Sequence, residues 1–188
     1  MSAAIESPEE TAGNISDSVG NILNAAIMPE TRLYLLLDAS RSFEIPVMLD
    51  ALSEDAVCLF DGAAKEDFAD TAPWLTPVSV DDDVFDWYMD EGWGRDWGVF
   101  LISSQTTGRV KSSLKRSVMV QDEDGQEMFF KFYRPSVLNV YLPVFEFEQA
   151  SYLMRDVAQF WTEWADDPTA MNCHEIKGGA LTSTKVQL

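Results

Sequence analysis

The chain of 188 residues carries 32 acidic and 13 basic side chains, which gives a formal net charge of −19 at pH 7. This charge argues against nucleic acid and anionic membranes as partners, because both would repel the protein. The length suits one domain with a proper core, and no run approaches the ~20 consecutive apolar residues of a membrane span. The acidic N-terminus does not resemble a signal peptide, and two cysteines do not make a disulfide framework. We therefore expect a cytoplasmic protein with protein partners.

The first thirty residues contain acidic side chains but no Lys or Arg, and their only apolar stretch is weak. This composition predicts a flexible acidic N-terminal tail over residues 1–30. Within the tail, residues 15–28 have the pattern of one amphipathic helix that would dock locally or on a partner.

Four short apolar runs predict strands. Residues 32–37, 56–60 and 97–102 are nearly uninterrupted, which is typical of strands that are covered on both faces. We expect residues 97–102 at the centre of the sheet. The run at residues 74–80 contains Pro77 and predicts an edge strand, because proline cannot donate a hydrogen bond to a neighbouring strand.

Apolar residues at helical spacing predict helices between and after these strands. The predicted helical segments are residues 43–52, 66–71, 81–91, 106–117, 134–141 and 146–155. Four basic residues lie on the flanks and back of segment 106–117, namely Arg109, Lys111, Lys115 and Arg116. We expect them to pair with acids of the same chain, the alternative being a docking face for an acidic partner.

From Ser117 to Tyr133 the sequence pattern changes from helical spacing to the two-residue period of a strand. Two β-rich runs there flank Asp124-Gly125, which is a strong hairpin signal. Residues 157–165 predict a strand, and residues 170–188 predict a second one before the end of the chain frays. The whole pattern predicts the α/β class, with a mixed sheet flanked by helices, a β-hairpin at residues 117–133 and a small C-terminal lobe. After the tail, residues 31–143 would form the core and residues 144–188 the C-terminal lobe and tail.

The sequence is poor in catalytic groups. It holds one histidine, His174, and no GxGxxG, GxxxxGK[ST] or GxSxG motif. The best enzymatic candidates are Asp38 and Asp61, each directly after an apolar strand, where parallel strands would present carboxylates to Mg²⁺. A helix cap at Asp38 and a turn at Asp61 explain the same residues more simply. We expect a protein that is not an enzyme, with no catalytic residue, metal or cofactor.

Six motifs occur in order between residues 32 and 164. They are LYLLLDAS at 33–40, CLFDG at 58–62, APWL at 72–75, GWGRDWGVFLIS at 92–103, LKRSVMVQDEDGQEMFFKFYRPSVL at 114–138 and YLP at 141–143. Taken together, the series resembles the adaptor family of bacterial type VI secretion systems, the effector chaperones called Tap or TEC.

The resemblance implies a protein without enzymatic activity that binds a cognate secreted effector and helps to load it onto the VgrG spike. Within this reading, our hypothesis places effector contacts in the C-terminal lobe, at Tyr152, Phe160, Trp161 and Trp164. It places spike contacts in the motif-rich part of the chain, at Trp93, Arg95, Trp97 and Arg134. The alternatives are an immunity protein that binds a toxin domain and, less favoured, a Mg²⁺-dependent hydrolase that uses Asp38 and Asp61.

Overall fold

The computed structural model describes residues 8–121, 124–164, 167 and 169–188, and the side chains of the first helix from residue 13 onward. The strands are β1 (Arg32–Asp38), β2 (Val57–Cys58), β3 (Pro73–Pro77), β4 (Gly98–Ser103), β5 (Met119–Gln121), β6 (Glu127–Phe129), β7 (Gln159–Glu163), β8 (Ala170–Lys177) and β9 (Ala180–Gln187). The α-helices are α1 (Pro8–Ala26), α2 (Glu44–Leu52), α3 (Gly62–Phe68), α4 (Asp83–Glu91), α5 (Thr107–Lys115), α6 (Pro135–Tyr141) and α7 (Phe147–Leu153). Short 3₁₀ helices are η1 (Ala39–Arg41), η2 (Ala69–Thr71) and η3 (Leu142–Val144). No helix within these residues has both the length and the apolar character to cross a membrane.

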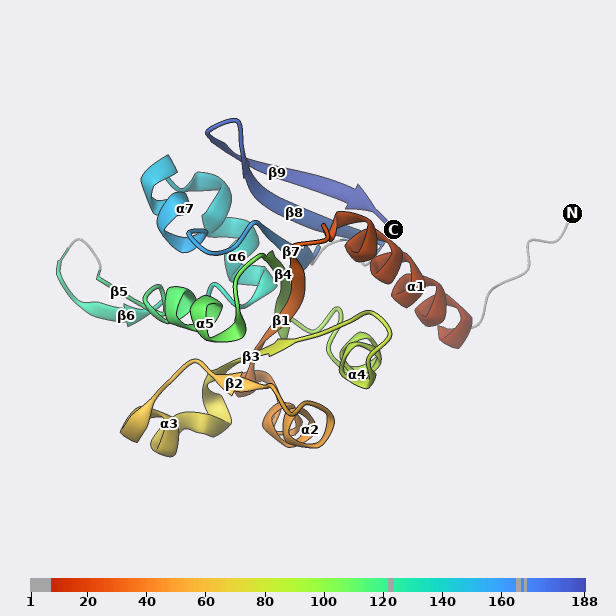
Figure 1. Cartoon of the computed structure of the whole chain (residues 1–188), viewed down its shortest axis with the longest axis horizontal. Coiled ribbons are helices and arrows are strands. Elements are labelled where there is room, and N and C mark those ends of the chain that lie inside the picture. The colour runs from red at the N-terminus through yellow and green to blue at the C-terminus, as the bar shows by residue number, and fades with distance from the viewer. Residues whose placement is uncertain (1–7, 122–123, 165–166, 168) are drawn as a thin grey trace, which may run out of the picture.

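Seven strands form the main sheet, in the order β2-β3-β1-β4-β7-β8-β9 (Figure 1). The apolar strand β4 lies in the middle of this order, which confirms the prediction of a central strand there. Every pairing in the sheet is antiparallel. The predicted α/β class with flanking helices is confirmed, but the sheet is antiparallel rather than mixed. The hydrolase hypothesis relied on parallel neighbours, whereas β3 separates β1 from β2 in this sheet.

Helices cover both faces of the sheet, because successive side chains of a strand point to opposite faces. In β1, Leu33, Leu35 and Leu37 pack with α1, α2 and α4, whereas Tyr34 and Leu36 pack with the helices of the other face. That other face is covered by α5, α6 and α7, through Val110, Leu114, Leu138 and Leu153. The result is a three-layer α/β/α arrangement with an apolar core on each side of the sheet.

The predicted hairpin is confirmed as a separate two-stranded sheet of β5 and β6. Gly125 in its turn has a φ of 77°, a conformation that glycine adopts without steric cost. The hairpin extends outward from the body of the protein beside α5 (Figure 1). Phe129 at the end of β6 is 60% exposed. The hairpin therefore presents apolar side chains to solvent.

The N-terminal segment differs from the expected flexible tail, because α1 runs from Pro8 to Ala26 and docks on the core. Val19 and Leu23, four residues apart on this helix, are completely buried. The amphipathic helix expected at residues 15–28, docking locally, is confirmed by these two buried positions, whereas the flexible tail expected for the segment as a whole is not. Residues 1–7 lie outside the described residues.

Two strand predictions were wrong in detail. β3 is not an edge strand, because it pairs with both β1 and β2, and its prolines, Pro73 and Pro77, occupy only its two ends. Residues 170–188 form two strands rather than one that frays. Gly178 and Gly179, with φ of 62° and 81°, form the turn between β8 and β9. Since β7 pairs with β4, the strands of the expected C-terminal lobe extend the main sheet.

Candidate functional site

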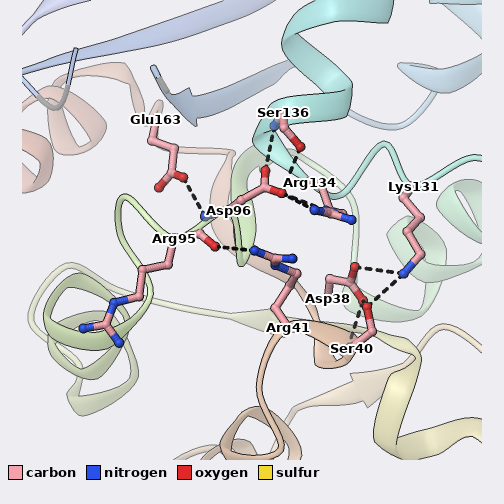
Figure 2. Close-up of polar contacts among 9 residues, drawn as sticks. All are labelled: Asp38, Ser40, Arg41, Arg95, Asp96, Lys131, Arg134, Ser136 and Glu163. Carbon is pink, nitrogen blue, oxygen red and sulfur yellow. Dashed lines mark hydrogen bonds and ion pairs between the residues drawn. The ribbon is translucent and has the colours of Figure 1, made fainter. Parts of the chain in front are cut away.

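A network of charged side chains joins three of the sequence motifs at one end of the sheet (Figure 2). Asp96, in the loop before β4, accepts hydrogen bonds from Arg134 Nε at 2.8 Å and Arg134 Nη2 at 2.6 Å. It also accepts from the backbone N–H of Ser136 at 2.7 Å and its hydroxyl at 2.8 Å, at the start of α6. Asp96 has a φ of 62°, which Asp tolerates better than most residues. The network thus fixes the loop of residues 92–97 against α6.

Glu163, at the end of β7, anchors the same loop from the other side. Its carboxylate accepts hydrogen bonds from the backbone N–H groups of Gly94 and of Asp96, the latter at 2.8 Å. Burial raises the pKa of Glu163 to about 7, and the two backbone N–H groups only partly oppose this effect. Glu163 therefore titrates near neutral pH.

The two aspartates proposed for a hydrolase are each engaged by lysines. Asp38 is completely buried and accepts hydrogen bonds from the Ser40 backbone and hydroxyl and from Lys131 Nζ, the last at 3.2 Å. Asp61 is exposed and pairs with Lys111 and with Lys115, which lower its pKa to about 2. Within the described residues, no group of three His, Cys, Asp or Glu side chains is placed to hold a metal ion.

The pairing of Asp61 confirms the expectation that the basic cluster on α5 pairs with acids of the chain. Lys111 and Lys115 bind Asp61, and Arg109 Nε lies 3.1 Å from Asp156 Oδ2. These contacts attach α5 to the start of α3 and to the segment before β7. Three of the four basic residues therefore pair within the chain, whereas Arg116 is exposed and forms no ion pair among the described residues.

A second polar network is buried beneath α6. Asn139 Oδ1 accepts hydrogen bonds from Thr162, Asn172 and His174, at 2.6, 3.0 and 2.9 Å. Because this oxygen can only accept, the neutral His174 ring carries its proton on Nε2, and Nδ1 accepts from the Ser183 hydroxyl at 2.7 Å. Burial lowers the pKa of His174 to about 4. The network joins β7, β8 and β9 to α6, and the histidine has no catalytic partner within it.

The four residues expected to contact a spike protein lie together but are unequally accessible. Trp97 is buried, Trp93 is half-buried, and Arg134 is engaged by Asp96. Arg95 is exposed, pairs with Glu91 and lies over the Trp97 ring at 6.0 Å. Trp97 therefore belongs to the core, Trp93 and Arg134 are partly accessible, and Arg95 is the most exposed of the four.

The four residues expected to contact an effector are divided in the same way. Phe160 and Trp161 are core residues on opposite faces of the sheet, so neither side chain offers a contact surface in this conformation. Truncating Trp161 would remove core packing rather than a binding contact. Trp164 is half-buried beneath Lys185, whose ammonium lies 5.2 Å from the ring centroid. Tyr152 on α7 is 48% exposed and remains available.

Sequence reasoning missed the apolar groove beside Tyr152, which we name the hairpin groove. It encloses about 440 Å³ between the hairpin and α7. Its lining residues are Arg116, Ser117, Met119, Val120, Phe130, Phe145, Glu148, Gln149, Tyr152 and Leu153. Tyr141, itself half exposed, extends the groove by packing edge-on against Phe130. The hydrophobic hairpin strands were the available signal, because a hairpin outside the main sheet leaves one apolar face uncovered.

A second groove shares no lining residue with the hairpin groove. It runs along α2 and includes the exposed side chains of Phe43 and Val47. We name it the α2 groove. The domain therefore carries two separate surfaces that expose apolar side chains.

These features define the class of the protein as a three-layer α/β domain that exposes two apolar grooves. Residues 33–152, more than half of the chain, match the family described as Domain of unknown function (DUF4123), and the chain belongs to this family. The matched region extends from β1 into α7 and contains Asp96, Arg134 and Ser136 together with the residues that line both grooves up to Tyr152, whereas Glu163 lies outside it. Comparisons with curated proteins and with solved structures gave no match.

Proposed function

We propose that this protein is a non-enzymatic adaptor of a type VI secretion system, which binds a cognate effector in the cytoplasm and helps to load it onto the VgrG spike. Membership of the DUF4123 family supports this proposal, because the family is associated with adaptors for type VI effectors. The ordered motif series of the sequence supports it independently of the fold.

The hairpin groove is the observation that carries the proposal at the level of structure. Met119 and Tyr152, on its two walls, are 42% and 48% exposed, which leaves apolar surface open to a partner. An exposed apolar hollow of this kind is typical of a protein-binding surface. We therefore assign effector contacts to this groove, with Tyr152 retained from the sequence hypothesis.

Effector capture with paired variants tests the proposal. The tagged full-length chain is used to capture its partners from a lysate of its own cells, and mass spectrometry identifies them. We expect a large effector together with a spike protein from the wild type. The double variant Met119→Ser/Tyr152→Ser should lose at least about tenfold of the effector, as expected when anchor side chains are truncated.

The matched control is Phe43→Ser/Val47→Ser, which removes two exposed apolar side chains from the α2 groove. Both double variants should keep the circular dichroism spectrum and melting temperature of the wild type, because the substituted side chains are exposed. Unchanged effector capture by Met119→Ser/Tyr152→Ser would refute the groove assignment. Capture of a toxin domain alone, with its activity suppressed, would instead identify an immunity protein.

A further inference from the structure

Among the large hydrophobic side chains of the described residues, the most exposed one lies in the α2 groove. Phe43, directly before α2, is 81% exposed, and Val47, one helical turn later, is 62% exposed. The groove encloses about 750 Å³ and is also lined by Pro46, Leu49, Asp50, Ser53, Glu54, Ala56, Ala69, Asp70 and Trp74. Residues four apart on a helix share a face, so Phe43 and Val47 form one apolar ridge along the groove.

Carboxylates surround this ridge. Asp50, Glu54 and Asp70 line the groove itself. A neighbouring hollow of about 570 Å³ shares Ser53 and Glu54 with it and adds three more acids, which are Asp55, Asp82 and Asp83. None of these six carboxylates forms an ion pair within the described part of the chain.

Few cations offset these acids. Arg32 lines the neighbouring hollow, and the Lys65 ammonium lies 5.9 Å from the centroid of the Trp74 ring. Six carboxylates against two cations leave this surface negative, in addition to the net charge of the whole chain. Such a surface repels an acidic segment and attracts a basic one.

We propose that the α2 groove binds a basic amphipathic segment of a partner protein. Its large apolar side chains cover Phe43 and Val47, and its Lys or Arg side chains face the carboxylates at Asp50, Glu54 and Asp70. Apolar burial supplies affinity, whereas the charges select the partner and speed its approach. The inference goes beyond the proposed function, because effector binding in the hairpin groove neither requires nor uses this surface.

Peptide binding measures this chemistry directly. The probe is a fluorescein-labelled helical peptide of Leu and Lys with one apolar face, and fluorescence anisotropy follows its binding to the full chain. Comparison peptides replace every Lys by Glu, or every Leu by Ser. We expect binding of the Leu/Lys peptide alone, with an affinity that falls as NaCl is raised.

Two double variants locate the site. Phe43→Ser/Val47→Ser and Asp50→Lys/Glu54→Lys should each weaken binding at least about tenfold. The second variant should also begin to bind the Leu/Glu peptide, because its charge is reversed. Met119→Ser/Tyr152→Ser is the matched apolar control, and Asp90→Lys/Glu127→Lys is the matched charge control, since both acids are exposed outside the two hollows. The controls should bind like the wild type.

Three results would overturn the inference. One is the absence of binding by the Leu/Lys peptide, and another is equal weakening by the two charge variants, which would reveal attraction to net charge alone. The third is a dimer of the wild type, seen by light scattering, that Phe43→Ser/Val47→Ser converts to a monomer, because the groove would then bind a second copy. Failure of the wild-type chain to capture any effector from the lysate would refute the proposed function without affecting any of these readouts.

Discussion

Glu163 and His174 lie on the neighbouring strands β7 and β8, and burial shifts their pKa values in opposite directions. The pKa of Glu163 is raised from 4.5 to about 7, so between these pH values the folded chain binds a proton that the unfolded chain does not. The free energy of unfolding therefore falls as pH rises through this window. The pKa of His174 is lowered from 6.5 to about 4, so its contribution rises with pH between these values. Each effect amounts to about 3 kcal/mol in full, and the two oppose each other.

We predict that single substitutions separate these opposing effects. For Glu163→Gln, the free energy of unfolding should rise by about 2–3 kcal/mol from pH 4.5 to 6.5, because only the His174 contribution remains. For His174→Gln it should fall by a similar amount across the same window, and the wild type should change little. Urea denaturation at a series of pH values measures all three profiles. Identical profiles for the three proteins would show that neither group titrates as its burial implies.

At the scale of the element, α1 shows how a segment with a tail-like composition becomes part of the core. Its two buried positions, Val19 and Leu23, pack in the same cluster as the α4 residues Phe85 and Tyr88. The attachment of α1 thus depends on a few apolar side chains in an otherwise polar helix.

We predict that Leu23→Ala lowers the free energy of unfolding by about 2–5 kcal/mol, the range for removing a buried leucine side chain. Asn24→Ala, one residue further along the same helix and exposed, should change it by less than about 0.5 kcal/mol. Chemical denaturation followed by tryptophan fluorescence checks both values. If Leu23→Ala were as stable as the wild type, α1 would behave in solution as the flexible tail that composition predicts.

At the scale of the whole molecule, the net charge of −19 opposes the compact state, because like charges are brought closer together on folding. Salt weakens this repulsion, since the screening length falls from about 10 Å at 0.1 M to about 3 Å at 1 M. Salt also weakens the surface ion pairs, such as Lys185 with Asp167, but each exposed pair contributes only about 0–1 kcal/mol. The repulsion should therefore dominate the response to salt.

We predict that raising NaCl from about 0.05 to 0.5 M increases the melting temperature by about 2–4 °C, which corresponds to ~1 kcal/mol for a chain of this size. KCl should have the same effect as NaCl, because screening does not depend on the identity of the cation. Differential scanning calorimetry measures the shift. A lower melting temperature at high salt would mean that the ion pairs outweigh the repulsion.

Local patterns in the sequence were sufficient to predict most individual elements. The apolar run of β4, the stripe Val110 and Leu114 on α5, and Asp124-Gly125 in the hairpin each depend on residues close together in the chain. Periodicity and turn chemistry act over such short distances, so they predict the kind of element and its position. They also predict that a face is apolar, but not which partner covers it.

Only the tertiary structure decided which of the predicted site residues are accessible. Trp161 was expected at a binding surface and lies in the core, because β7 pairs with β4 and enters the main sheet. Arg134, which was expected to contact a spike protein, binds Asp96, 38 residues earlier in the chain. The order and direction of the strands bring such distant residues together, and no local pattern encodes that order. The sequence by itself determined the α/β class and the abundance of apolar and acidic side chains, whereas the packing of distant elements determined where those side chains remain exposed.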